Sequence, residues 1–542
     1  MAKVYIRGAG IHATGTIALV NKTGSWRYVK PVHEEKMPPC NNACPAGNDI
    51  QGFIKLVREE KLLDAWRLIK KTSPLPGVCG RVCPHPCEKE CNRGKYDEAM
   101  SIHILERLVA DYAISQKATE KSRVAPKKEK IAVVGSGPAG LSCAHFLAQE
   151  GYQVTVFEAL PEVGGMLRVG IPRYRLPRKI LDKEITDIEA LGVIFKTNAR
   201  IKDINELKEY DAVFIAAGAH VSRKLDIPGE DAAGVISGTE FLRQLSLNGK
   251  SKIGKNVIVV GGGNTAIDAA RSAIRLGSKA TIVYRRTRDE MPAVEDEIEA
   301  VGKEGIEIVY LAAPTKIIAQ GGKIKEVECV RMKLGAPDAS GRKRPVPIEG
   351  STFKIKADTV ITAVGEASDL SLLPKDVKLV EKGIKAKGMQ IFGGGDAVTG
   401  AGRVVDAIAS GRRAARFIDN ALSGTPVEEK QAKEIAKYEE INTAYFPQQA
   451  AARMPELSAA KRTANFSEIN RGIPVEKGVR EAKRCFSCGV CRECNNCLYF
   501  CPDICVSLKD GKYDFDYDYC KGCGICSHEC CTGLIRMVQE AQ

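Results

Sequence analysis

Apolar positions follow different patterns in successive parts of the chain, and each pattern predicts a different kind of structure. In residues 49–71 and 100–114 apolar side chains recur at i, i+3 and i+4, which predicts amphipathic helices. Between about 130 and 425, short apolar runs alternate with glycine-rich turns and helical segments. That alternation is typical of parallel sheets with helices between the strands, so the predicted fold class is α/β.

The same patterns predict where domains begin and end. With 542 residues the chain is long enough for three or four domains, each with its own core. A polar linker near 115–130 and a polar connector after 425 separate the main blocks. The predicted segments are an arm (1–38), a helical domain (39–115), a first nucleotide domain in two parts (130–237 and 366–425), a second nucleotide domain (238–365), a connector (426–484) and a cysteine-rich domain (485–542).

The 20 cysteines are distributed unevenly, with six in residues 40–91 and twelve in residues 485–531. Polar residues interrupt the apolar stretch at the start of the chain, which is a poor signal peptide, and no apolar run is long enough to cross a bilayer. We therefore expect a cytoplasmic protein whose clustered thiols stay reduced and bind metal. Cys143 and Cys329 lie apart from the clusters and are expected to be small buried residues.

A first dinucleotide site is predicted where the strand KIAVVG runs into the loop G-S-G-P-A-G. Gly135 permits a tight turn, Gly137 lets the backbone approach a pyrophosphate, and Gly140 allows close packing of helix and strand. The helix that follows would hold the phosphates at its N-terminus. The next strand ends at Glu158, which is placed to bond a ribose hydroxyl. A purely structural glycine turn is the alternative.

A second site of the same kind begins at KNVIVVGGGNTAIDAA, where Gly261 and Gly263 precede Ala266. The next strand ends in two arginines instead of an acid. Guanidinium groups suit the 2′-phosphate of NADP, so NADPH is favoured over NADH, although the pair could also be a solvated surface feature. The residues predicted to contact this nucleotide are Gly261, Gly263, Asn264, Arg285 and Arg286.

Two dinucleotide folds in one chain suggest FAD in the first and a nicotinamide in the second. In the later stretch MQIFGGGDAVTGAGRVV, Asp396 would reach the flavin ribityl–pyrophosphate region. The segments GGMLRVGIPRYRLPRKIL (164–181) and VYRRTRDEMPA (283–293) resemble the glutamate synthase small subunit and the same module in dihydropyrimidine dehydrogenase. The resemblance adds Gly165 and Met166 to the FAD site. It implies hydride transfer from the nicotinamide to FAD, followed by one-electron transfer into iron–sulfur clusters.

The cysteine-rich domain contains two ferredoxin-type runs, each with the spacing C-x2-C-x2-C-x3-C. Zinc is the rival metal, but zinc ribbons pair two C-x2-C knuckles across a gap. Because the fourth cysteine of each run crosses to the other cluster in two-cluster ferredoxins, two ligand sets follow. One is Cys491, Cys494, Cys497 and Cys530; the other is Cys520, Cys523, Cys526 and Cys501. Cys505 and Cys531 are then spare and are predicted to be packing residues.

The N-terminal cysteines resemble the two-cluster helical domain of the glutamate synthase small subunit. On that resemblance Cys79 is not a ligand, and one cluster would take Cys44, Cys83, Cys87 and Glu106. The family's leading R-C-x2-C is missing here, yet R-C-F-S-C-G occurs at 484–489. Our hypothesis is that this segment folds back to complete the other cluster, with ligands Cys40, Cys91, Cys485 and Cys488. The alternatives are a spare pair beside the ferredoxin or a small separate metal site.

Four clusters and a flavin pyrophosphate change the interpretation of the formal charge of +14. Four-iron clusters with four thiolates carry about −2 each, so the total falls to roughly +4 to +6. A basic nucleic-acid binder is therefore disfavoured, and the two dinucleotide folds argue against it further.

Both ends of the chain resemble the δ (ferredoxin) subunit of 2-oxoacid:ferredoxin oxidoreductases. The resemblance lies in the arm NKTGSWRYVKPV (21–32) and in the tail DGKYDFDYDYCKGCGICSHEC (510–530). It implies an electron-transfer subunit of a thiamine-dependent 2-oxoacid oxidoreductase, with the arm docking on a partner. The alternative is a general NADPH-input module for glutamate synthase or another reductase, in which Trp26 and Arg27 belong to a simple exposed loop.

Overall fold

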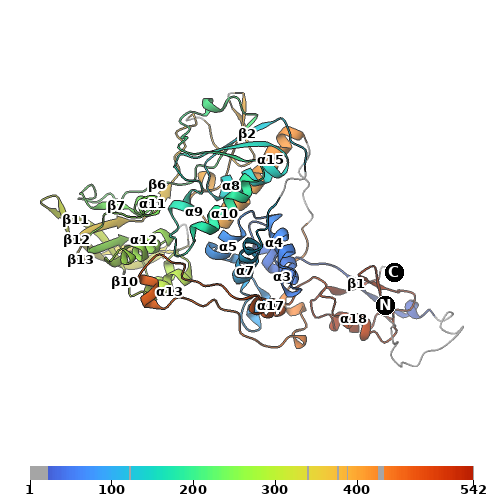
Figure 1. Cartoon of the computed structure of the whole chain (residues 1–542). Helices are drawn as coiled ribbons and strands as arrows, with labels where there is room; N and C mark the ends of the chain where they lie inside the picture. Colours follow the sequence, from blue (N-terminus) through green and yellow to red (C-terminus); the bar gives the residue numbers. More distant parts are fainter. Residues whose placement is uncertain are drawn as a thin grey trace.

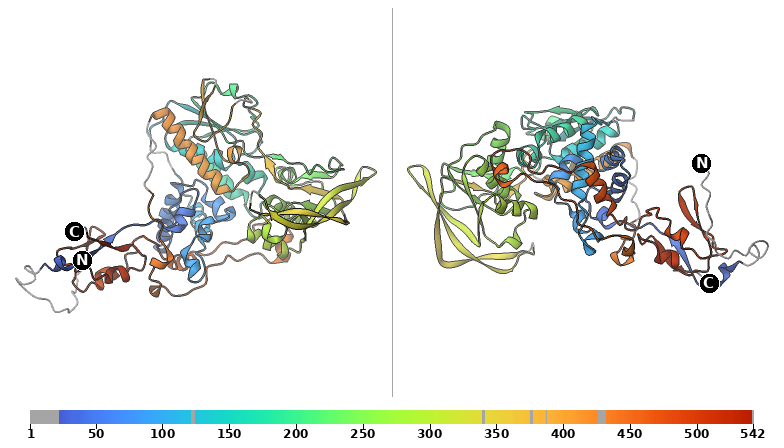
Figure 2. Two further views of the ribbon diagram at one scale, coloured as in Figure 1. Left: turned by 180° about the vertical axis from the view of Figure 1, so that it is seen from behind. Right: turned by 60° about the horizontal axis from the view of Figure 1, so that its bottom comes forward.

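Three parts of the protein lie in a row (Figures 1 and 2), and the first nucleotide domain lies above the middle one in Figure 1. This is a computed structural model, and it describes residues 22–120, 124–338, 341–374, 377–386, 388–424 and 432–540. Long antiparallel strands between residues 312 and 356 occupy one end, the helical domain lies in the middle, and the cysteine-rich domain occupies the other end. The predicted arm over residues 1–21 lies outside the described part.

The helical domain forms where the sequence predicts it. Asp49 accepts a hydrogen bond from the Gly52 N–H and caps the first long helix, and a left-handed Glu60 (φ 60°) separates that helix from the next. Their apolar faces pack together with the last helix around Phe53 and Leu105. The helices are α2 (Pro39–Ala43), α3 (Ile50–Arg58), α4 (Leu62–Lys70), α5 (Pro76–Val82), α6 (Pro86–Lys89) and α7 (Ile102–Ser115).

The first nucleotide domain is built on a six-stranded sheet in the order β16-β17-β5-β2-β3-β4. Neighbouring strands are parallel except for β16 and β17, and helices α8 (Pro138–Gln149) and α15 (Val404–Ser423) pack together beside the sheet (Figure 1). Its strands are β2 (Lys130–Val134), β3 (Gln153–Phe157), β4 (Ile194–Lys196), β5 (Ala212–Ile215), β16 (Ile384–Ala386) and β17 (Met389–Gly393).

The second nucleotide domain is a five-stranded parallel sheet in the order β10-β9-β8-β14-β7. Because β7 belongs to this sheet, the domain begins a few residues before the predicted boundary at 238. The antiparallel strands β11 (Ala312–Gln320), β12 (Lys323–Pro337) and β13 (Lys343–Lys356) extend from it. Its own strands are β7 (Val235–Ser237), β8 (Asn256–Val260), β9 (Lys279–Tyr284), β10 (Glu307–Tyr310) and β14 (Thr359–Thr362).

The arm and the chain's last strand pair with one another. Strand β1 (Val29–His33) is antiparallel to β20 (Ile535–Gln539), and the hairpin of β18 (Val506–Lys509) and β19 (Lys512–Phe515) lies in the same domain. The described part of the arm is therefore built into the cysteine-rich domain. In the described part of the chain, no helix is both long enough and apolar enough to cross a membrane.

The connector and helix α17 (Val475–Lys483) link the nucleotide domains to the cysteine-rich domain. The connector passes along the helical domain, reaches the second nucleotide domain at α16 (Ala459–Thr463), and returns to α17. Helix α17 packs on α3 and α7 and leads directly into the R-C-x2-C segment.

Candidate functional site

The first glycine loop is shaped by close backbone contacts. Gly135 has a φ of +103°, and a Cβ there would lie 2.4 Å from the Ala216 carbonyl oxygen. A Cβ on Gly140 would lie 1.9 Å from the Gly135 carbonyl oxygen, so helix α8 can approach strand β2 only with glycine at this position. A Cβ on Gly137 would meet nothing within 4 Å. The loop therefore turns tightly and leaves its backbone open beside the α8 N-terminus, as a pyrophosphate requires.

Glu158 lies at the end of β3, next to this loop. The buried carboxylate accepts hydrogen bonds from the backbone N–H and the hydroxyl of Ser136, and from the Leu160 N–H at 2.8 Å. These bonds hold the carboxylate at the edge of the loop, as the predicted contact with a ribose requires.

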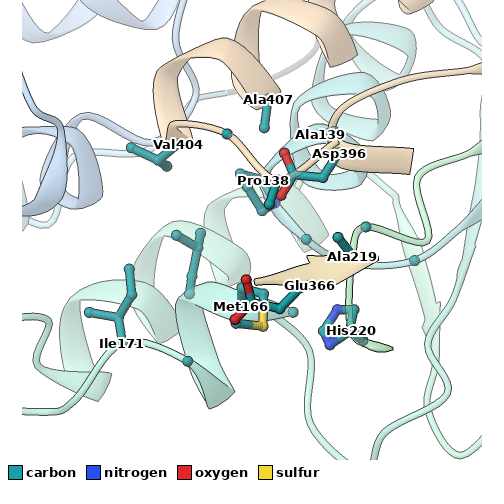
Figure 3. Close-up of a pocket in the computed structure, with 18 of the residues that line it drawn as sticks. Pro138, Ala139, Met166, Ile171, Ala219, His220, Glu366, Asp396, Val404 and Ala407 are labelled. Atoms are coloured by element: carbon teal, nitrogen blue, oxygen red, sulfur yellow. The ribbon is translucent and has the colours of Figure 1, made fainter. Parts of the chain in front are cut away.

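A single large cavity of about 1070 Å³ connects the two nucleotide loops. Its wall includes the first glycine loop, Gly165 and Met166 before and within α9 (Met166–Val169), and Asp396 at the start of α14 (Asp396–Thr399) (Figure 3). Burial raises the pKa of Asp396 to about 6. A cavity of this size, with a helix N-terminus at its wall and both apolar and polar lining residues, fits a dinucleotide.

Sequence reasoning missed several residues of this cavity. Glu366 and His220 line it, as Figure 3 shows, and Thr265 donates a hydrogen bond to Glu366 at 3.2 Å. Burial raises the pKa of Glu366 and lowers the pKa of His220. Glu366 follows strand β14 after A-V-G, and His220 follows strand β5 after A-A-G-A. That position at the carboxyl edge of a parallel sheet is the signal that could have found them.

The second glycine loop opens onto the same cavity. Gly261 has a φ of +146°, and a Cβ there would lie 2.2 Å from the Ala363 carbonyl oxygen. Gly263 precedes helix α12 (Asn264–Arg275), and Asn264 lines the cavity while its side-chain oxygen accepts from the Val294 N–H. The loop therefore presents a second helix N-terminus to the cavity.

The two arginines after β9 have different surroundings. Arg285 is exposed. Arg286 is only 3% exposed, and its guanidinium donates to the Lys343 carbonyl oxygen at 2.7 Å and to Asp338 at 2.6 Å. The prediction that both bind a 2′-phosphate therefore needs correction at Arg286, because Lys343 of strand β13 and Asp338, just after strand β12, already engage that side chain.

The structure brings the R-C-x2-C segment to the helical domain. Cys40, Cys91, Cys485 and Cys488 line one small cavity. Burial raises the pKa of Cys40, and the neighbouring sulfurs of Cys91, Cys485 and Cys488 raise it further. Four thiols that are difficult to ionise on their own are suited to a cluster whose irons would stabilise their thiolates. The geometry is the one that the fold-back hypothesis requires.

Contacts around Arg484 hold this segment in place. Its guanidinium donates to Glu481 at 2.7 Å and to Asp97 at 3.1 Å, and its carbonyl accepts from Arg93 at 2.8 Å. Phe486 packs edge-on against Phe446 with ring centroids 4.6 Å apart. Buried, charge-assisted bonds of this kind fix the backbone on which the two cysteines stand.

The other predicted N-terminal set is also gathered. Burial raises the pKa values of Cys44, Cys83 and Cys87, and the Glu106 carboxylate is among the charges that raise them further. Burial likewise raises the pKa of Glu106 to about 8. Three thiols and one buried carboxylate form a donor set that fits a four-iron cluster. Cys79, predicted not to be a ligand, is buried with its sulfur 3.9 Å from the Ser73 hydroxyl.

The cysteine-rich domain contains two further cavities, and the crossed ligand sets line them. Cys491, Cys494, Cys497 and Cys530 line the first cavity. Cys501, Cys520, Cys523 and Cys526 line the second, together with Cys505. The spare Cys505 thus lies at a cavity wall, whereas Cys531 packs with Phe446 and Phe486.

A short bonded path joins the helical domain to the first of these cavities. Cys488 is followed by Gly489, whose N–H donates to the Thr532 carbonyl oxygen at 2.7 Å. The Thr532 hydroxyl lies 3.6 Å from the Cys530 sulfur. Two cysteines from different cavities are therefore linked through one backbone hydrogen bond and one hydroxyl contact.

One group of possible ligands has no counterpart in the sequence predictions. His85, Glu88 and His103 bring potential ligand atoms within 4.8 Å of one another. The His85 and His103 rings stack 4.2 Å apart, and Glu88 bonds His103 at 2.8 Å. His85 and Glu88 also line the large cavity, so this group lies between that cavity and the N-terminal cysteines.

Comparisons with known proteins agree with this layout. The family model described as pyridine nucleotide-disulphide oxidoreductase matches residues 129–411, and the model for dihydropyrimidine dehydrogenase domain II, 4Fe-4S cluster, matches residues 33–118. The chain is 40% identical over 496 residues to the NADP(+)-dependent formate dehydrogenase subunit beta of Moorella thermoacetica, covering 83% of this chain and 70% of that protein.

Two other relatives are similar over comparable lengths. The NADPH-Fe(3+) oxidoreductase subunit beta of Geobacter sulfurreducens is 38% identical over 511 residues, covering 83% of this chain and 75% of its own length. The NADPH glutamate synthase small chain of Escherichia coli is 36% identical over 418 residues, covering 71% of this chain and 89% of its own. These matches confirm the resemblance to the glutamate synthase small subunit. The chain therefore belongs to the pyridine nucleotide-disulphide oxidoreductase family, and it is an FAD-dependent NAD(P) oxidoreductase that carries a 4Fe-4S domain.

Proposed function

We propose that this chain exchanges electrons between NAD(P)(H) and four iron–sulfur clusters through FAD, as the electron-transfer subunit of a larger enzyme. The observation that carries the proposal is the series of cysteine sites between the large cavity and the exposed end of the cysteine-rich domain. Pro84 and His85, beside Cys83, line the large cavity, while Cys523 in the last set is exposed to solvent. Electrons could thus enter at the nucleotides and leave at the surface.

At the FAD site, this chain's residues would bind and orient the cofactor. The α8 N-terminus would hold the pyrophosphate, Glu158 the ribose, and Asp396 the ribityl–pyrophosphate region. When bound, FAD would supply the conversion between hydride transfer and single-electron transfer. The enclosing wall of residues around Met166 would exclude water from the reacting face.

At the nicotinamide site, Asn264 and the α12 N-terminus would receive the pyrophosphate. The exposed Arg285 would bind a 2′-phosphate, which favours NADP. Arg286 would instead stabilise the structure next to the site through its bond to Asp338.

Between the domains, the path through Gly489 and Thr532 would carry electrons from the cluster at Cys488 to the cluster at Cys530. The R-C-x2-C segment has a second role in this proposal. It tethers the ferredoxin-like domain beside the helical domain, so the two clusters stay at a constant separation.

For the partner, we propose a thiamine-dependent 2-oxoacid oxidoreductase. The support is the resemblance of both ends to the δ subunit, together with an exposed aromatic pair on the arm: Trp26 is 59% exposed and Tyr28 82% exposed. Aromatic residues exposed next to an electron exit are typical of a docking surface. The relatives favour a second candidate, an NADPH-linked module of another reductase. They are named as a subunit of NADP(+)-dependent formate dehydrogenase, a subunit of an NADPH-Fe(3+) oxidoreductase, and the small chain of glutamate synthase.

Two measurements test the proposal. The purified chain should contain FAD and about 16 iron atoms, and it should reduce a dye with NADPH but leave 2-oxoacids unoxidised. A single chain that oxidises a 2-oxoacid would contradict the subunit role. Purification from the native host identifies the partner: thiamine-dependent subunits support the first candidate, and recovery with a glutamate synthase large subunit or a formate dehydrogenase supports the second.

Deleting the arm would be an unclear test, because it would remove β1 from its pairing with β20. The double substitution Trp26→Ala, Tyr28→Ala is cleaner, since both side chains are exposed and neither lines a cysteine cavity. We expect it to weaken complex assembly and leave dye reduction by NADPH unchanged. If the variant assembles as fully as wild type, Trp26 and Tyr28 are not part of the docking surface.

A further inference from the structure

The two ferredoxin-type runs are identical in spacing but differ in the surroundings of one position. Cys494 and Cys523 are each the second cysteine of their run, and both are exposed to solvent. The other cysteines that line the same cavities are buried or half-buried. An exposed ligand is the one that water and competing ligands reach first, so Cys494 and Cys523 are the weakest points of their sites.

A second thiol, that of Cys531, contacts one of these two ligands, Cys494. The Cys531 sulfur lies 3.7 Å from the Cys494 sulfur, and Cys531 is only 3% exposed. It occupies the position after the fourth cysteine, where the first run has Pro502. A proline there would place no sulfur near Cys494.

The structure holds Cys531 firmly in this place. Its side chain packs with Ile441, Phe446 and Phe486, and the next residue, Thr532, accepts the backbone hydrogen bond from Gly489. Its sulfur therefore stays within one van der Waals contact of Cys494 while Cys530, its chain neighbour, faces the cavity.

Cys505, the other spare cysteine, is placed differently. Its thiol donates to the Asp503 carbonyl oxygen at 3.3 Å, and its backbone N–H donates to the Cys501 sulfur at 3.2 Å. It therefore contacts Cys501, and it lines the same cavity as Cys523. Each exposed ligand thus has one spare cysteine at its site, and the spare Cys531 has its sulfur in contact with the exposed ligand itself, Cys494.

We propose that Cys531 is a reserve ligand that takes the place of Cys494 on the cluster held by Cys491, Cys497 and Cys530. The inference rests on the proposed function only in assuming that this cavity holds a four-iron cluster. In the exchange, the Cys531 thiol releases its proton to water and its thiolate binds the iron, while the Cys494 thiolate leaves and takes up a proton. One iron–sulfur bond forms as another breaks, and no electron is gained or lost.

The test compares the iron content of the full chain and its variants, purified without oxygen. Wild type should hold about 16 iron atoms, Cys494→Ala about 16, and the double variant Cys494→Ala, Cys531→Ala about 12. The matched double variant Cys523→Ala, Cys505→Ala, which removes the exposed ligand and the spare cysteine of the other cavity, should also hold about 12. Electron paramagnetic resonance of Cys494→Ala should show one cluster with a shifted spectrum and the other ferredoxin cluster unchanged. That unchanged spectrum also shows that the domain has folded.

A second measurement avoids the loss of any proposed ligand. Cys531→Ala keeps all four ligands, but it should release one cluster to an iron chelator several-fold faster than wild type does. Cys329→Ala changes a buried cysteine in the core of the second nucleotide domain, so it is the control and should match wild type. Equal release rates for Cys531→Ala and wild type would overturn the proposal.

The iron counts separate the possible failures. About 12 iron atoms in Cys494→Ala, with about 16 in wild type, would overturn the reserve ligand and leave the four clusters standing. A wild-type chain without clusters in the ferredoxin-like domain would overturn the proposed function itself.

Discussion

The helical domain and the ferredoxin-like domain both gather cysteines into buried cavities, but they obtain them differently. In the ferredoxin-like domain, two cavities draw their predicted ligands from residues 491–530 alone. In the helical domain, one cavity combines Cys40 and Cys91 with Cys485 and Cys488, from the far end of the chain. Regularly spaced cysteines thus indicate a site built from one segment, whereas an incomplete set of cysteine ligands indicates that a distant segment supplies the rest. The helical domain should consequently depend on residues beyond its own boundaries.

The largest expected effect comes from truncation. A chain that ends after residue 480 should lose about 12 of about 16 iron atoms, because the cluster at Cys40 and Cys91 would lack two ligands. A chain that ends after residue 489 keeps Cys485 and Cys488, so it should retain about 8 iron atoms. Analysis of iron and acid-labile sulfide distinguishes them. If both truncated chains retain about 8, the two domains are independent and the comparison fails.

Within the full chain, the double substitution Cys485→Ala, Cys488→Ala should remove one cluster, or about 4 iron atoms. The spectrum of the ferredoxin pair should persist, because none of that pair's proposed ligands is changed. Cys329→Ala is a suitable control, since that buried cysteine lies in the second nucleotide domain. Loss of a ferredoxin signal with the N-terminal signals intact would show that Cys485 and Cys488 serve the ferredoxin-like domain, which would contradict this prediction.

A third prediction uses Glu106, the carboxylate that distinguishes the helical domain from the all-cysteine ferredoxin sites. Its pKa is raised to about 8, so in a cluster-free chain its contribution to stability is present below about pH 4.5 and is lost as the pH rises through 8. Urea unfolding of such a chain should therefore show a decrease of about 2–4 kcal/mol between pH 5 and pH 9. Glu106→Gln should remove most of this decrease. An equally steep pH dependence in the variant would assign it to other groups.

The smallest expected effect concerns the two arginines, which show the same contrast between a local motif and its tertiary surroundings. Arg285→Ala should weaken NADPH about 10- to 30-fold relative to NADH, the loss of about 1.4–2 kcal/mol from a charge-assisted bond. Arg286→Ala should lower stability, because Asp338 would lose a buried partner, yet change the NADPH-to-NADH ratio little. Titration with both nucleotides checks this. A change of the ratio only in Arg286→Ala would reverse the roles.

Much of the architecture could be predicted because it depends on local constraints. A turn with positive φ at Gly135 and a helix that approaches within contact at Gly140 each restrict the residue type at one position. The strands buried on both faces appear in the sequence as short apolar runs. The spacing of cysteines in a ferredoxin run is a local constraint as well. For these features the sequence and the structure agree.

By itself, then, the sequence determined the fold class and the two nucleotide loops, and it predicted which cysteines would lie together. Only the tertiary structure decided that Asp338 and Lys343 engage Arg286, that Glu366 and His220 share a cavity with Asp396, and that the Cys531 sulfur contacts the Cys494 sulfur. These contacts join segments far apart in the chain. The free energy of closing a loop grows only slowly with its length, so separation along the sequence gives almost no information about which distant residues will meet.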